Sequence, residues 1–105
     1  MNQQPELWIG LVEFRPLNRA AYGAAGAFTN IVTWATNAVE FRKKAETIGA
    51  TLDLYVAGVE EEEPLAARLV KADLDESIED MVSRAEQNPN AIVYGTFHRY
   101  FHDEA

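Results

Sequence analysis

Apolar side chains at the start of the chain follow the two-residue spacing of a β-strand. Residues 7–14, LWIGLVEF, are rich in β-branched and aromatic side chains, and the run stops at Arg15-Pro16. Both faces of this stretch begin with apolar side chains, so we expect a central strand or one that is covered on both sides. Residues 15–26 contain one proline and two glycines and are predicted to form a loop.

Residues 27–48 admit two interpretations. Residues 27–35 carry β-branched and aromatic side chains and no charge, which favours a strand. A single helix over residues 27–48 is the alternative. Asn37 and Glu40 have the spacing of a helix N-cap and a partner that reaches back, so we place a helix start at Asn37 and its C-terminal cap at Gly49. The apolar stripe of this helix consists of Ala38, Phe41, Ala45 and Ile48.

The middle of the chain changes from an alternating pattern to a run of charge. Residues 50–59 alternate between apolar and polar side chains, which predicts a strand with one face on the core. The four carboxylates of residues 60–63 repel one another, so we expect a solvated loop there, and Pro64 is expected to end any strand ladder. Residues 65–70 fit either a helical turn or a short edge strand, and the pattern does not decide between them.

A second helix and a last strand follow. Asp73 and Glu76 have the spacing of a capping pair, and Asn88-Pro89-Asn90 is expected to end the helix. Residues 91–102 predict the last strand, and residues 101–105 are expected to fray into a polar tail. The apolar stripe of the second helix consists of Leu74, Ile78, Met81, Val82 and Ala85.

The element order is therefore β-β-α-β-α-β, within one domain that spans residues 1–105. We expect an α+β fold, a two-layer sandwich with a four-stranded, mostly antiparallel sheet and two helices on one face. The alternative is a ferredoxin-like β-α-β-β-α-β order, which needs a single helix over residues 27–48 and a strand over residues 66–72. Which face of the sheet the helices cover is left open.

Charge narrows the range of partners. The chain has 17 acidic and 9 basic residues and a formal charge of −8. Binding to nucleic acid or to an anionic membrane needs cations, so we expect neither, whereas a basic protein would be attracted. No cysteine is present, and no basic leader or long apolar stretch is seen, so we expect a soluble, cytoplasmic protein.

The two histidines suggest a metal site at first, because His98 and His102 are four residues apart. On a strand that rises ~3.3 Å per residue, they lie roughly 13 Å apart and cannot share one ion. The run of residues 60–63 lacks the ligand spacing of a calcium loop, and no glycine-rich phosphate loop is present. We therefore expect neither a metal nor another cofactor.

Catalysis would have to centre on His98. Histidine suits general base chemistry near neutral pH, and Glu13 or Asp53 could orient it if their strands were neighbours. Arg15 or Arg99 would then hold an anionic group. The alternative function is therefore a small dimeric enzyme or a small-molecule-binding protein that uses His98 with Glu13 or Asp53, in a pocket between the helices and the sheet. The sequence does not supply this geometry, so it favours a binding module.

Two surfaces are predicted for partners. Tyr94, Thr96, His98 and Tyr100 alternate along the last strand and would share a face, with Tyr55 joining from the third strand. An acidic lobe would combine the glutamate run with the start of the second helix. The expected function is to bind or neutralise a basic protein, as immunity and inhibitor proteins do, or to form a homodimer through the aromatic face. The acidic residues concerned are Glu60, Glu61, Glu62, Glu63, Asp75 and Glu76, with Asp73, Glu79 and Asp80 nearby.

Overall fold

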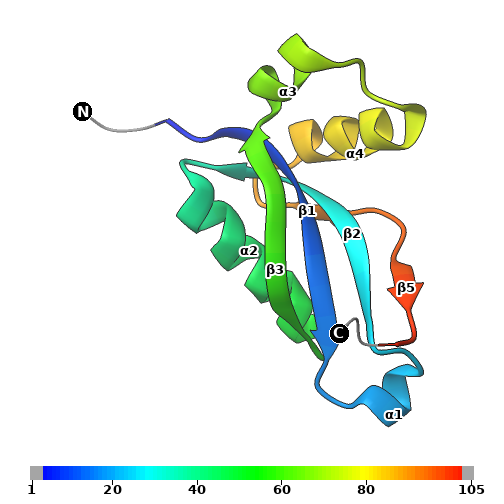
Figure 1. The fold of residues 1–105 in the computed structure, drawn as a ribbon. Coiled ribbons are helices and arrows are strands. Elements are labelled where there is room, and N and C mark those ends of the chain that lie inside the picture. The colour runs from blue at the N-terminus through cyan, green and yellow to red at the C-terminus, as the bar shows by residue number, and fades with distance from the viewer. Residues whose placement is uncertain (1–3, 103–105) are drawn as a thin grey trace.

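The computed structural model describes residues 4–102, so the end of the predicted polar tail, residues 103–105, lies outside the described part. An antiparallel sheet and helices make up this part (Figure 1). The strands are β1 (Glu6–Pro16), β2 (Gly26–Ala35), β3 (Leu54–Pro64), β4 (Ile92–Tyr94) and β5 (His98–Tyr100). The helices are α1 (Arg19–Tyr22), α2 (Ala38–Thr51), α3 (Leu65–Lys71) and α4 (Glu76–Gln87).

The strands lie in the order β3-β1-β2-β4, and β5 also pairs with β2. All of these pairings are antiparallel. The predicted α+β class is therefore confirmed. The ferredoxin-like alternative is wrong, because residues 27–35 are a strand and residues 65–71 are a helix.

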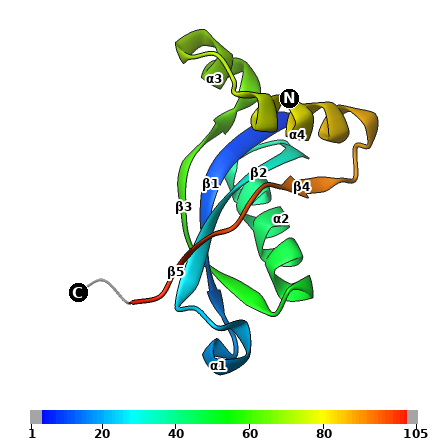
Figure 2. The ribbon, with the colours of Figure 1, turned by 90° about the vertical axis from the view of Figure 1, so that its right-hand side faces the viewer.

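Helices pack on both faces of the sheet, so the prediction of two helices on one face is wrong. Trp8, Val12 and Phe14 of β1 form one core cluster with residues of α2. The alternate residues Leu7 and Ile9 form a second cluster with residues of α3 and α4. Both faces of β1 are apolar, and each one is covered by a different helical layer. Figure 2 shows the sheet curving around α2, with α3 and α4 over one end of it.

The start of α2 is as predicted, but its end is not. The Asn37 side chain accepts a hydrogen bond from the Glu40 amide at 2.9 Å, and the Glu40 carboxylate accepts one from the Thr36 amide at 2.9 Å. Gly49 is buried inside the helix rather than capping it. A Cβ at this position would lie 2.8 Å from the Phe14 ring, so the glycine permits close packing of α2 on β1.

β3 differs from its prediction at both ends. It begins at Leu54 because α2 continues to Thr51, and it runs through residues 60–63 to Pro64. The glutamate run was expected to form a loop, but it pairs with β1 as part of an edge strand, where side chains can reach water. The pairing shifts register twice, once near Glu61, which has a positive φ of 57°. Pro64 is tolerated because it is the last residue of this edge strand.

The N-cap of α4 is Asp75 rather than the predicted Asp73. Its carboxylate accepts hydrogen bonds from the Ile78 amide at 2.9 Å and from the Ser77 hydroxyl at 2.8 Å. The four residues that link α3 to α4 carry no helix, which moves the start of α4 beyond Asp73. The predicted stripe is confirmed for Ile78, Met81 and Ala85, which are buried against the sheet, and for the partly buried Val82. Leu74 packs on the same cluster but lies before the helix begins.

The last predicted strand is broken into β4 and β5. Tyr94 pairs with Ile31 and His98 pairs with Phe28, so four steps along this segment match three steps along β2. The extra residue is a bulge, and a one-residue slip moves the following side chains to the other face. The predicted loop of residues 15–26 also contains structure, because β1 continues to Pro16 and α1 forms one short helix.

Candidate functional site

One end of the molecule carries almost all of the net charge. Residues 60–80 form the end of β3, α3 and the start of α4, and they contain nine carboxylates but only two cationic side chains, Arg68 and Lys71. Their formal charge is therefore −7, out of −8 for the whole chain. Figure 1 shows these segments together at the top of the molecule. We call residues 60–80 the acidic end.

Glu63 is the carboxylate of the acidic end that is best paired. Its side chain is only 16% exposed and forms ion pairs with both Arg68 and Lys71. Hydrogen bonds from Lys71 and Arg68 lower the pKa of Glu63 below its ordinary value of 4.5. The expectation that all four glutamates are solvated is therefore wrong for Glu63. Asp80 also has a partner, since its carboxylate lies 3.0 Å from the Arg84 guanidinium.

The other carboxylates of the acidic end form no ion pair within residues 4–102. Among them, only Asp75 has side-chain hydrogen bonds, and those from the Ile78 amide and the Ser77 hydroxyl lower its pKa. Apart from the half-buried Glu62, these side chains are exposed. A dense and uncompensated negative field therefore faces the solvent here. The residues are Glu60, Glu61, Glu62, Asp73, Asp75, Glu76 and Glu79.

Apolar side chains are exposed beside this charge. On α3, Leu65 turns into the core, whereas Leu69 is 52% exposed and Val70 is 86% exposed. Ala66 is exposed as well, and residues at positions i, i+3 and i+4 share one face of a helix. The outer face of α3 is therefore an apolar strip on a charged background. The sequence alone did not reveal it, because the secondary structure of residues 65–70 was undecided.

A cleft of about 500 Å³ lies between α4 and the segment that joins β4 to β5. It brings together residues that are far apart in sequence: Asp75 beside α4, and Tyr94, Thr96 and His98 from the end of the chain. These are four of the predicted partner-binding residues. Asn30, Ser77 and Arg84 also line the cleft. Nothing in the sequence pointed to them, because the packing of α4 against β2 is a tertiary contact.

The predicted aromatic face is not a single face. Tyr94 shares the α2 side of the sheet with Ile31, and the centroids of the Tyr94 and Phe97 rings are 5.4 Å apart. His98 and Tyr100 lie on the other side, because of the bulge after β4. Tyr55 pairs with Arg15, which places it on the same side as His98 and Tyr100, and it is 48% exposed. Homodimer formation through this side of the sheet stays a prediction.

Glu13 bonds with Tyr100 rather than with the predicted His98. The Tyr100 hydroxyl donates to the Glu13 carboxylate, and the Arg15 guanidinium lies 3.5 Å from the same oxygen. Burial, helped by the negative charge of Glu13, raises the pKa of Tyr100 above 10.0. Within residues 4–102 we find no hydrogen bond or ion pair that joins His98 to Glu13 or Asp53. The catalytic role of His98 stays a prediction without a supporting contact.

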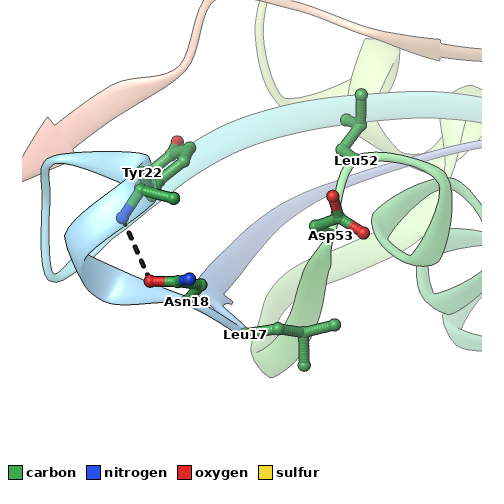
Figure 3. Close-up of a pocket in the computed structure, with 6 residues that line it drawn as sticks. Leu17, Asn18, Tyr22, Leu52 and Asp53 are labelled. Atoms are coloured by element: carbon green, nitrogen blue, oxygen red, sulfur yellow. Dashed lines mark hydrogen bonds between the residues drawn. The ribbon is translucent and has the colours of Figure 1, made fainter.

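Asp53 lines a separate pocket at the end of the molecule opposite to the acidic end (Figures 1 and 3). This pocket lies between α1 and the turn from α2 to β3 and has a volume of about 450 Å³. Arg99 was also expected to hold an anionic group. Its guanidinium carbon lies over the Tyr22 ring, 5.1 Å from the ring centroid. The sequence singled out Asp53 but missed the neighbours that make it part of a pocket, which are Leu17, Asn18, Ala21, Tyr22 and Leu52.

No group of three or more potential metal-ligating side chains lies together in the described part of the chain. In the described part of the chain, no helix is long and apolar enough to span a membrane. Comparisons with protein-family models, with curated proteins and with solved structures found no match.

Proposed function

We propose that this protein is a binding module for a basic protein partner, and that the acidic end is its docking surface. The observation that carries the proposal is the placement of seven unpaired carboxylates around the exposed apolar strip of α3. Charge at one end steers a cationic partner toward that end and accelerates encounter. Leu69 and Val70 then supply apolar surface that can be buried on docking.

Inhibition is a natural consequence of such docking. A protein that acts on an anionic substrate needs a basic surface to attract it. A module that covers this surface with its own carboxylates competes with the substrate. Binding and neutralisation are therefore one property of the acidic end, and they do not require His98 chemistry.

A pair of charge-matched variants tests this proposal. One carries Asp73→Asn, Glu76→Gln and Glu79→Gln in the acidic end, and the other carries Glu6→Gln, Glu46→Gln and Glu86→Gln elsewhere. Both variants lose the same net charge but lose it at different places, and Glu46→Gln also removes an ion pair with Arg42. The probe is a synthetic helix of leucine and lysine, and its affinity is measured by calorimetry at low salt.

The acidic-end variant should bind the lysine helix about tenfold more weakly, equivalent to about 1.4 kcal/mol. The control variant should stay close to the parent protein. Equal weakening in both variants would mean that the probe senses only net charge, and the docking surface would be refuted. Leu69→Ser with Val70→Ser should weaken the binding that persists at high salt, because salt screens the charges but not the apolar contact.

A further inference from the structure

Two segments of the chain, which backbone hydrogen bonds hold together, form the pocket at the opposite end. Leu17 follows β1, and its amide donates to the Asp53 carbonyl at 3.0 Å, which ties the start of α1 to the turn before β3. The Asn18 side chain caps α1 by accepting from the Ala21 amide at 3.1 Å, and Gly23 closes the helix in the left-handed conformation. The side chains around the pocket are therefore held by backbone contacts on two sides.

Asp53 sits in this wall in an unusual conformation. Its φ of 58° lies in the left-handed region, which aspartate and asparagine enter more readily than most other residues. Its carboxylate forms no hydrogen bond or ion pair with the described residues. Figure 3 shows this carboxylate between the side chains of Leu52 and Leu17, with Tyr22 on the other side of the view. An acceptor with full charge is therefore available at the pocket wall.

The remaining lining is mostly apolar. Leu17 is 68% exposed and Leu52 is 37% exposed, and Ala21 and the half-buried Tyr22 complete the wall. The Asn18 amide adds a polar group beside them. Asp53 supplies the single carboxylate of this lining, which contains no Lys, Arg or His. The volume of about 450 Å³ falls within the range of roughly 300–1,000 Å³ that is usual for small-molecule sites.

We propose that this pocket binds a small organic cation, a primary ammonium carried on an apolar chain or ring. The Asp53 carboxylate accepts charge-assisted hydrogen bonds from the ammonium. Leu17, Ala21 and Leu52 bury the apolar part of the ligand. An anionic ligand is disfavoured by the carboxylate, and a neutral apolar ligand leaves that carboxylate without a partner.

Three probes of similar shape test the chemistry: phenethylammonium, 2-phenylethanol and 3-phenylpropionate. Binding is followed by amide chemical shifts in a titration of the whole protein. Phenethylammonium should shift residues 17–22 and 52–53 in a saturable way. The alcohol should bind about tenfold more weakly, and the carboxylate should not bind, because hydrogen bonds to charged groups are stronger than neutral ones.

Asp53→Asn is the decisive variant, because asparagine tolerates the left-handed backbone and keeps the shape of the side chain. It should weaken phenethylammonium binding about tenfold and leave the alcohol unaffected. A structural defect would weaken both ligands, so this split separates charge pairing from damage to the pocket. Glu86→Gln removes one exposed carboxylate from α4 that, like Asp53, forms no ion pair within residues 4–102, and it serves as the matched control.

The acidic end is the competing site for any cation. Shifts confined to residues 60–80, or equal affinity for the amine and the alcohol, would overturn the proposal. Unchanged amine binding by Asp53→Asn would overturn it as well. Leu17→Ser, at an exposed position, should weaken the amine and the alcohol alike. None of these results depends on whether a basic protein docks at the acidic end.

Discussion

At the scale of single residues, the two tryptophans occupy contrasting positions. The indole N–H of Trp8 is buried and has no hydrogen-bond partner among residues 4–102, although the ring packs beside Phe41. The indole N–H of Trp34 donates to the Ala85 carbonyl at 2.7 Å and thereby joins β2 to α4. The same substitution therefore has different consequences at the two positions.

We expect Trp8→Phe to change the free energy of unfolding by less than about 1 kcal/mol, because it removes an unsatisfied donor together with some apolar contact. Trp34→Phe should cost about 1–3 kcal/mol, because it removes a hydrogen bond. Urea unfolding of both variants measures the difference. A loss at Trp8 that equals or exceeds the loss at Trp34 would contradict this assignment.

At the scale of elements, β5 is attached to the sheet by a side chain that crosses a glycine. Gly26 of β2 pairs with Tyr100, and a Cβ at position 26 would lie 2.3 Å from the Tyr100 hydroxyl and 2.8 Å from the Phe14 carbonyl. The Tyr100 hydroxyl reaches Glu13 on β1 across this gap. The short strand β5 is thereby linked to two longer strands.

Gly26→Ala should destabilise the protein by about 1–3 kcal/mol through overpacking and should raise hydrogen exchange in residues 98–100. Gly58→Ala is the matched control, because a Cβ there would meet only the Glu13 carboxylate at 3.9 Å. We expect the control to be close to neutral. If the amides of β5 stayed protected from hydrogen exchange in Gly26→Ala, the passage of the Tyr100 side chain over Gly26 would not be what holds β5.

Several features that depend on neighbouring residues were predicted correctly from the sequence. Several that depend on pairing between distant segments were not. The cap at Asn37 and the stripe of α4 were found because their partners lie within four residues. The strand character of residues 60–63 depends on pairing with β1, about fifty residues away in the sequence, and charge alone argued against it. The faces of Tyr94 and His98 depend on one extra residue opposite β2, which no pattern in the last segment reveals.

The two candidate sites differ in the same way, since one depends on neighbouring residues and the other on distant segments. The acidic end was predicted because its carboxylates cluster in the sequence itself. The pocket at Asp53 was not, since Leu17 and Tyr22 reach it from another segment of the chain. A sequence pattern shows which residues are charged, but it does not show which residues from other segments will surround them.

At the scale of the whole molecule, the response of stability to acid includes the ion pairs of Glu63 with Arg68 and Lys71. Glu63 has a lowered pKa in the folded state, so its contribution to stability is present above about pH 4.5 and is lost as the pH falls through its folded value.

Glu63→Gln isolates this contribution. We expect this variant to be less stable than the parent at pH 7 and to approach it below pH 4.5, because only the parent loses the ion pairs with Arg68 and Lys71 on acidification. Thermal unfolding between pH 3 and 7 measures the gap between the two curves. A gap that stays constant with pH would contradict a role for the ionised carboxylate.

The edge strand β3 also affects how copies of the protein behave in a crowded solution. An uninterrupted edge invites other strands to add to it, which is the first step toward aggregation. In β3 the register shifts interrupt this edge, and consecutive glutamates give neighbouring copies the same charge. The carboxylates of the proposed docking surface therefore also oppose growth of the sheet into a fibre, so any change that neutralises the run in β3 weakens a barrier to self-assembly.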